Sequence, residues 1–352
     1  MDISKIDKNF SVKTNIKRDG MVFHSAEESG FKVYGIFREN GQYTRMPEAA
    51  AKSVSDGVYA LHGNSSGGRL RFKTDSPYVA LSAVLEKDGV GKMPHFAFTG
   101  SIGFDMYTRE DGGWIYSGTV IPPVDVEDRF EGIIDFGGAE EREILIHFPL
   151  YSTVREVYIG IDNKAVIKPP TPYAVDKPIV FYGSSITQGG CASRPGNSFS
   201  NIVSRTLDAD HINLGFSGSA CGEREIAEYI SKIPMSAFIY DYDHNAPTAE
   251  HLAATYGKMF ETIRKANPDV PIVMLTRPKV HLTCDEIKRM ETVKETYVKA
   301  KNDGDKNVYF IAGNELIQSK YAEFATVDNT HPNDIGFFSM AEVLCGLLKK
   351  II

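Results

Sequence analysis

The sequence lacks the cysteine patterns of zinc-binding and disulfide-stapled domains. Its four cysteines, Cys191, Cys221, Cys284 and Cys345, lie far apart and form no C-x-x-C pair. This spacing excludes a zinc ribbon and gives no sign of a disulfide framework. We therefore expect reduced thiols and a cytoplasmic protein.

Long apolar runs and long runs of one charge are also missing. No stretch reaches the roughly 18 apolar residues that a membrane-spanning helix needs. The charged N-terminus, residues 1–8, lacks the apolar segment of a signal peptide. Lys and Arg number 39 against 46 Asp and Glu, and neither sign clusters. We accordingly expect neither a membrane nor a nucleic acid among the partners.

The 352 residues are 42% hydrophobic and 24% charged, which is typical of a globular chain with room for two domains. The pattern of apolar and polar residues changes at the proline-rich stretch 168–172. Such a stretch is typical of a linker and cannot enter a sheet interior. The sequence therefore predicts an N-terminal domain over residues 1–170 and a C-terminal domain over residues 171–352.

The first half is rich in short β-branched and aromatic runs separated by Gly, Asp, Asn and Ser. This spacing, with few helical periods, predicts an antiparallel β-sandwich of the jelly-roll kind. The expected strands are 70–73, 78–85, 95–98, 103–107, 114–120, 144–149 and 154–161.

The second half alternates short apolar runs with helical segments, which predicts a doubly wound, flavodoxin-like α/β domain with a parallel five-stranded sheet. Ligands of such sheets bind outside the carboxyl ends of the strands. The expected strands are 179–182, 211–214, 237–240, 272–275 and 308–311.

The loop Gly183–Gly190 follows the first of these strands and is built of small residues. Such a loop can cradle a phosphate on its N–H groups, but the Walker spacing and G-x-G-x-x-G are both absent. It can also present a serine nucleophile at the sheet edge, beside a helix N-terminus. A polar turn without a catalytic role is the third interpretation.

Three later segments hold residues that could assist a serine nucleophile. The loops 213–219 and 241–247 hold a glycine and an asparagine that suit an oxyanion hole. In the segment 328–334, an Asp three residues before a His can orient the imidazole as a general base. The alternative for that segment is a helix cap formed by Asn333 or Asp334.

These segments together resemble the SGNH/GDSL esterase superfamily, from about Pro178 to the C-terminus. The resemblance implies a serine esterase without a cofactor. The implied residues are Ser185 as nucleophile and oxyanion donor, Gly218 and Asn245 as further donors, and His331 with Asp328 as base and orienter.

The chain departs from the family pattern at two places. Ser184 stands where the family usually has Asp before the nucleophile, and Asp243-His244-Asn245-Ala246 stands where G-x-N-D is usual. The stretch Gly103-Phe104-Asp105-Met106-Tyr107 resembles the G-x-D-L-Y motif of the β-sandwich that precedes one branch of this superfamily.

The resemblance implies hydrolysis of a small acyl ester, such as an acetylated saccharide. We expect Arg194, Asp243 and His244 to contribute to substrate binding. The sequence does not decide the oligomeric state, and a homo-oligomer is one of the alternatives. Arg45 is a candidate for reaching across to the second domain.

Two other functions remain alternatives. Asp243, His244 and His331 could meet as ligands of a hydrolytic zinc site. The chain could also be a non-catalytic carbohydrate-binding protein. His95 lies in a region without clustering and is expected to be a surface histidine or a satisfied core histidine.

Overall fold

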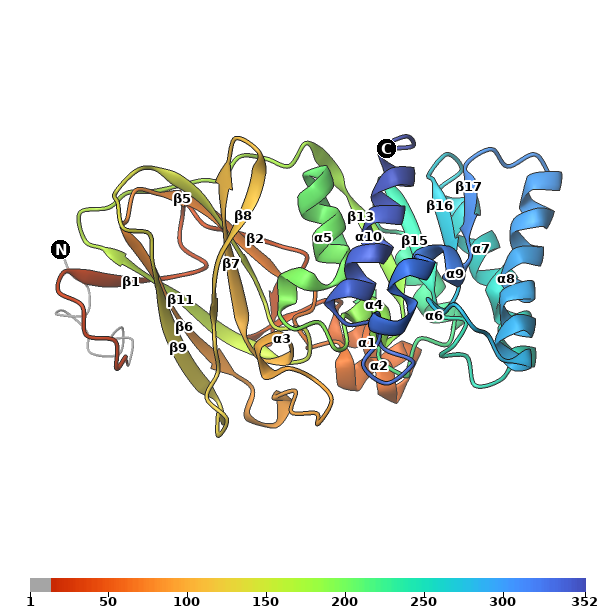
Figure 1. Cartoon of the computed structure of the whole chain (residues 1–352), viewed down its shortest axis with the longest axis horizontal. Coiled ribbons are helices and arrows are strands. Elements are labelled where there is room, and N and C mark those ends of the chain that lie inside the picture. Colours follow the sequence, from red (N-terminus) through yellow and green to blue (C-terminus); the bar gives the residue numbers. More distant parts are fainter. Residues whose placement is uncertain (1–13) are drawn as a thin grey trace.

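The structure is a computed structural model that describes residues 14–352. The charged residues 1–8, from which the sequence predicts the absence of a signal peptide, lie outside the described residues. A β-rich half and an α/β half lie side by side along the long axis (Figure 1). No helix within residues 14–352 combines the length and apolar character needed to cross a membrane.

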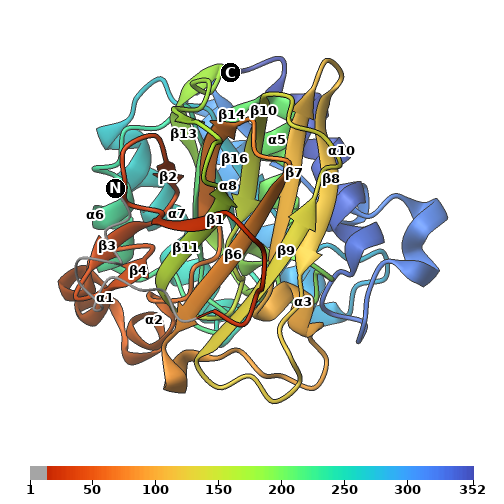
Figure 2. The same ribbon diagram turned by 90° about the vertical axis from the view of Figure 1, so that its left-hand side faces the viewer.

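The first half contains two antiparallel sheets that face each other (Figures 1 and 2). One sheet has the order β1 (Met21–Ser25), β11 (Val154–Asp162), β6 (Tyr78–Leu85), β9 (Arg129–Asp135). The other has the order β12 (Ile167–Lys168), β5 (Arg69–Thr74), β10 (Arg142–His147), β7 (Phe104–Glu110), β8 (Gly113–Val120), with β2 (Lys32–Tyr34) beside β5. A short hairpin joins β3 (Phe37–Glu39) to β4 (Gln42–Thr44).

Alternating side chains of the two sheets form one shared core. Leu70 and Phe72 of β5 point inward and meet Val79 and Leu81 of β6, and all four are fully buried. The period of two follows from the pleat of a strand, which sends successive side chains to opposite faces. The predicted antiparallel sandwich is therefore confirmed.

The structure differs from the sequence expectation within this half. Residues 95–98 form no strand but a turn that leads into the short helix α3 (Phe98–Ser101). The helices α1 (Glu48–Val54) and α2 (Asp56–Leu61) were not expected. Met46, Ala51 and Val58 from this region are buried against the core of the second half. We keep residues 1–170 and 171–352 as the proposed domains, with this segment packed on the C-terminal one.

The second half contains a parallel five-stranded sheet, as predicted. Its order is β14 (Ala209–Gly215), β13 (Val175–Gly183), β15 (Ala237–Asp241), β16 (Ile272–Leu275), β17 (Val308–Ile311). In chain order this is 2-1-3-4-5, the flavodoxin-like arrangement, whose ligand site lies where the order reverses between the first and third strands. The carboxyl end of β13 lies at that switch point.

Helices cover both faces of this sheet. Val180 and Tyr182 point to one core and Ile179 and Phe181 to the other, again with the period of a strand. The face of Val180 is covered by α6 (Arg224–Ile230), α7 (Ala249–Ala266) and α8 (Cys284–Asn302), and the opposite face by α5 (Phe199–Leu207) and α10 (Asp334–Leu348). The short helices α4 (Ser185–Gln188) and α9 (Gly313–Leu316), with 3-10 turns at Lys87–Gly89, Pro195–Asn197 and Ser319–Phe324, complete the described elements.

Candidate active site

Ser185 is the first residue of α4, directly after the carboxyl end of β13. Ser184 caps this helix, since its Oγ accepts the N–H of Ile186 at 3.0 Å. Gly189 ends the helix in the left-handed conformation, with φ of 100°, which favours glycine. The small residues of this loop therefore form one tight helical turn that holds Ser185 at the switch point.

His331 comes from the turn before α10 and reaches this serine. Its Nε2 lies 3.0 Å from Ser185 Oγ, and its Nδ1 lies 2.8 Å from Asp328 Oδ2. Asp328 Oδ1 also accepts the N–H groups of Thr330 and His331, at 3.0 and 2.7 Å. Asn329 permits this tight turn by adopting a left-handed backbone, with φ of 61°.

The protonation state of this group follows from its partners. Partial burial disfavours the charged form of Asp328, but the hydrogen bonds from the N–H and imidazole of His331 hold its pKa below the usual value. The ionised carboxylate accepts the proton on Nδ1, so Nε2 of the neutral ring faces the hydroxyl of Ser185. This is the arrangement in which an imidazole can remove a proton from a serine.

A second set of contacts fixes helix α10 to the segment that follows α4. Asn333 caps α10 by accepting the N–H groups of Ile335 and Gly336. Asp334 accepts the Ser193 N–H and the Asn197 amide, both at 2.9 Å. Helix capping and catalysis are therefore compatible interpretations of the segment 328–334, because different residues carry them.

Hydrogen bonds also tie the loops of the expected oxyanion donors to this site. Phe216 N donates to Gly183 O at 2.7 Å, and Asn245 Nδ2 donates to Phe216 O at 3.2 Å. Gly218 has φ of 69°, and a side chain built on it would meet only open space. Its N–H donates to no acceptor within residues 14–352. Asn245 keeps a second amide proton.

His244 and Asp243, which were expected to bind substrate, form a chain of hydrogen-bond contacts with Ser184. His244 Nε2 lies 2.8 Å from Ser184 Oγ, and His244 Nδ1 lies 2.8 Å from Asp243 Oδ1. Asp243 Oδ2 accepts the N–H of Arg277 at 3.1 Å. The two departures from the family pattern therefore contact each other: a serine replaces the usual aspartate, and a histidine from the third loop binds it.

Arg194 bridges the two halves of the chain. Its guanidinium binds the Asp105 carboxylate at 2.9 Å and the hydroxyl of Tyr107, both on β7. Asp105 also accepts the N–H of Gly196 at 2.9 Å. The aspartate and tyrosine of the G-x-D-L-Y-like motif thus hold the segment that follows α4 in place. The charge of Arg194, expected at the substrate, is already paired.

Arg45 reaches across to the second half, as the sequence suggested. Its guanidinium donates to the carbonyls of Asn213 and Gly215 and to that of Leu61. Burial lowers its pKa to about 9. Three carbonyl acceptors stabilise this cation away from water, and two of them fix the end of β14 beside α4.

The turn at residues 95–98 reaches the site from the first half. The ring of His95 lies 5.5 Å from that of His331, and the ring of Phe96 lies 4.5 Å from that of Tyr151. Tyr151 Oη donates to the carbonyl of Ser185 at 3.2 Å. His95 is exposed, in agreement with the expected surface histidine. Its position beside His331 was not predicted, because residues 95–98 were expected to form a strand and the contact depends on tertiary packing.

Asp243, His244 and His331, the zinc ligands considered from the sequence, do not form one cluster in the described part of the chain. Asp243 and His244 bind each other and Ser184, while His331 binds Asp328 and Ser185. The one group in the described part of the chain whose potential ligand atoms lie within 4.8 Å of one another is a different one, formed by His95, Cys191 and His331.

Two protein-family models match the chain. The GDSL-like Lipase/Acylhydrolase family matches residues 176–349, and the N-terminal domain of the SGNH-hydrolase-type esterases, named for its G-x-D-L-Y motif, matches residues 21–167. A comparison with the curated proteins returns no match.

Solved structures with the same fold cover nearly the whole chain. A Bacteroides ovatus protein assigned as a GDSL-like lipase is 29% identical over 94% of this chain and 98% of its own, with a TM-score of 0.84. A salicylyl-acyltransferase from a tetracycline biosynthetic pathway is 20% identical over 93% and 96%, with a TM-score of 0.74. A family two carbohydrate esterase from Clostridium thermocellum is 18% identical over 81% and 92%, with a TM-score of 0.57.

Proposed function

Because the chain belongs to the GDSL-like lipase/acylhydrolase family and is an ester hydrolase, we propose that it is a serine esterase that removes small acyl groups, chiefly acetyl, from a carbohydrate. The observation that carries this proposal is the distance of 3.0 Å between Ser185 Oγ and His331 Nε2, together with the contact of 2.8 Å between His331 and Asp328. Ser185, His331 and Asp328 are the proposed nucleophile, base and orienter.

The reaction proceeds in two halves. His331 Nε2 takes the hydroxyl proton as Ser185 Oγ attacks the ester carbonyl, and the tetrahedral intermediate then expels the alcohol, which receives that proton from His331. Water next attacks the acyl-enzyme, with His331 again taking a proton and returning it to Ser185. Asp328 keeps the imidazole oriented and stabilises its charged form in both halves.

Three neutral donors are proposed to hold the oxyanion: the N–H of Ser185, the N–H of Gly218 and the amide of Asn245. The first sits at the N-terminus of α4, where the helix favours negative charge. One well-placed donor of this kind contributes about 10²–10³ in rate. Since the mechanism uses only side chains and backbone, it requires no cofactor.

The preference for a small acyl group rests on the packing around the nucleophile. Ser185 is almost entirely buried, and Phe96, Tyr151 and Cys191 beside it are buried as well. These buried side chains form the wall beside Ser185 from which we propose the preference for a short acyl chain. The carbohydrate is proposed from fold relatives, including a family two carbohydrate esterase and an acetyl xylan esterase from Butyrivibrio proteoclasticus.

Hydrolysis assays test this proposal. We expect p-nitrophenyl acetate and acetylated xylo-oligosaccharides to be cleaved, p-nitrophenyl octanoate to be cleaved far more slowly, and the rate to survive EDTA. Loss of activity with EDTA would favour the metal-dependent alternative. Binding of oligosaccharide without turnover would favour the non-catalytic one. A cytoplasmic location is proposed from the cysteine pattern alone.

A further inference from the structure

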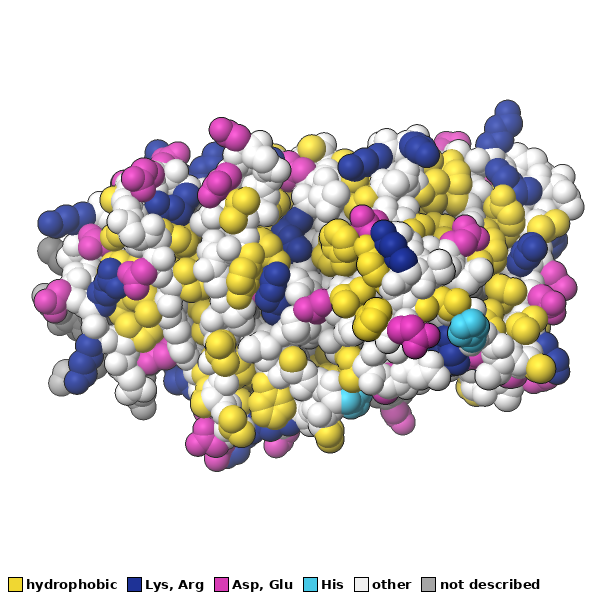
Figure 3. Space-filling view, viewed as in Figure 1, with side chains coloured by type: hydrophobic (Ala, Val, Ile, Leu, Met, Phe, Trp, Pro, Cys, Tyr) yellow, Lys and Arg dark blue, Asp and Glu magenta, His cyan; other side chains and the backbone are white. Residues whose placement is uncertain are grey.

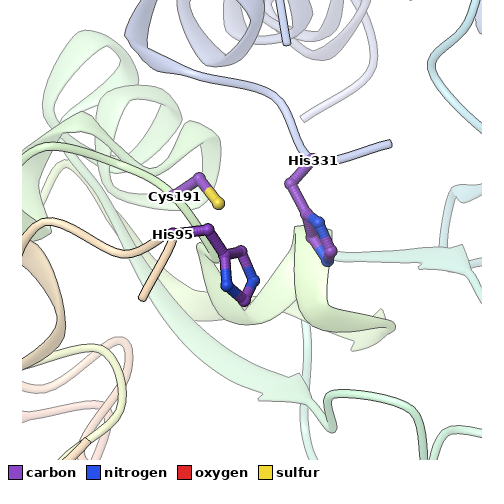
Figure 4. Close-up of side chains that lie close together, drawn as sticks. All are labelled: His95, Cys191 and His331. Carbon is purple, nitrogen blue, oxygen red and sulfur yellow. The ribbon is translucent and has the colours of Figure 1, made fainter. Parts of the chain in front are cut away.

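Three side chains of types that bind metals lie close together, and one of them is His331, the proposed catalytic base. His95 comes from the first half, Cys191 from the loop after the nucleophile helix, and His331 from the turn before α10. Their potential ligand atoms all lie within 4.8 Å of one another. Figure 4 shows the Cys191 sulfur pointing toward the gap between the two rings.

The chemistry of this group suits a thiophilic cation. Imidazole nitrogen and thiolate sulfur are preferred ligands of Zn²⁺, and tetrahedral coordination places ligand atoms roughly 3.5 Å apart. The three groups must therefore approach one another by about an ångström. His95 can make this movement, because its side chain is exposed. Cys191 forms no disulfide in the described part of the chain.

We propose that His95, Cys191 and His331 form an inhibitory binding site for Zn²⁺ or a similar thiophilic divalent cation, with water in the fourth position. Metal binding itself goes beyond the proposed function. The inhibitory effect rests on that function, because it requires His331 to be the catalytic base.

The geometry of His331 makes such a site inhibitory. Its Nδ1 is committed to Asp328, so only Nε2 is free to bind a metal. Nε2 is also the atom that faces Ser185 Oγ. A cation on Nε2 therefore occupies the lone pair that must accept the serine proton. The carboxylate behind Nδ1 strengthens the metal site, as carboxylate partners of metal-bound histidines do.

The test titrates ZnCl₂ into the whole metal-free protein by calorimetry and, in parallel, into an acetate-ester assay. We expect one Zn²⁺ per chain and complete inhibition that EDTA reverses, with no inhibition by Mg²⁺. Cys191→Ser and His95→Ala should each weaken binding at least about tenfold. The matched control Cys284→Ser, at an exposed cysteine, should bind as the wild type does.

Binding and catalysis are separated by Ser185→Ala, which should lose turnover and still bind Zn²⁺. The Co²⁺ complex should show thiolate charge-transfer absorption that disappears in Cys191→Ser. Absence of a binding heat, or equal affinity in wild type, Cys191→Ser and His95→Ala, would overturn the metal site. Zinc bound at these residues without inhibition would leave the site in place and refute the role of His331.

Discussion

The hydroxyl of Ser184 lies 2.8 Å from Nε2 of His244, beside a second serine that contacts a second histidine. The two serines differ in access: Ser184 is 0% exposed, whereas Ser185 is 7% exposed. Solvent therefore reaches Ser185 but not Ser184. We infer that the Ser184–His244 pair positions α4, and that the pair formed by Ser185 and His331 carries the reaction.

Ser184→Ala is expected to weaken the enzyme without abolishing it. The substitution removes the cap of α4 and leaves His244 without its donor, so stability should fall by about 1–2 kcal/mol. We expect kcat to fall about tenfold, because the start of α4 carries Ser185.

A double-mutant cycle with His244→Ala checks this coupling. The unfolding free energies of Ser184→Ala, His244→Ala and the double variant, measured in urea, should reveal an interaction of about 1 kcal/mol. Additive effects would show that the contact of 2.8 Å contributes nothing to stability.

Asp328→Asn should lower kcat while leaving the fold intact. An asparagine amide accepts poorly where the carboxylate holds Nδ1–H, so the imidazole loses its favoured tautomer. Such a change costs up to about 10⁴ in kcat. The side chain of Asp328 is 38% exposed, so water replaces part of its effect, and we expect a loss nearer about 10². Glu323→Gln, at an exposed position in the preceding 3-10 turn, is the control; an equal loss there would contradict the assignment.

Asp241 makes stability depend on pH in a defined direction. Burial raises the pKa of this carboxyl from 3.8 to about 6. Between these values the native state binds more protons than the unfolded state, so this contribution to stability decreases as the pH rises and is fully lost above the native pKa. A shift of this size corresponds to about 3 kcal/mol.

Asp241→Asn removes this titration. Relative to the wild type, the variant should gain stability in urea between about pH 4 and about pH 7. Asn Oδ1 can still accept the hydrogen bonds from Ser184 and Thr187. The exposed control Asp125→Asn should show no such gain. A constant difference between Asp241→Asn and wild type across this pH range would refute the prediction.

Arg194→Met should loosen the contact between the two halves. It leaves the buried carboxylate of Asp105 with its partners His147 and Gly196 only. We expect a loss of about 1–3 kcal/mol in unfolding free energy, from the penalty for a buried group with an incomplete set of partners. Arg224→Met, whose side chain lies on the surface, should change stability by less than about 0.5 kcal/mol. Similar stability losses in the two variants would mean that the bridge to β7 is unimportant.

The periodic parts of the fold could be predicted from the sequence. The expected strands 272–275 and 308–311 agree with β16 and β17 at both ends, because buried parallel strands form short continuous apolar runs. Helices α1 and α2 were missed although Glu48-Ala49-Ala50-Ala51-Lys52 is a run of strong helix formers and Ser55 caps α2. Their packing is determined by tertiary contacts, which local sequence does not encode.

The candidate site could also be predicted only in part. Loop position and the Asp328-x-x-His331 spacing indicated which residues meet, whereas side-chain partners depend on rotamers and on the other half of the chain. The ion pair of Arg194 with Asp105 and the contact of His95 with His331 both join the two halves, so local sequence could not predict them.

The surface, with both charge signs interspersed over the face in Figure 3, agrees with the composition.

Covalent trapping with a fluorophosphonate tests the central claim most directly. Ser184 and Ser185 share one peptide, so the modified residue must be located by fragmentation in a mass spectrometer. We predict one adduct, on Ser185, that is absent in Ser185→Ala and His331→Ala and still forms in Ser184→Ala. Modification of Ser184, or labelling that survives Ser185→Ala, would contradict the account.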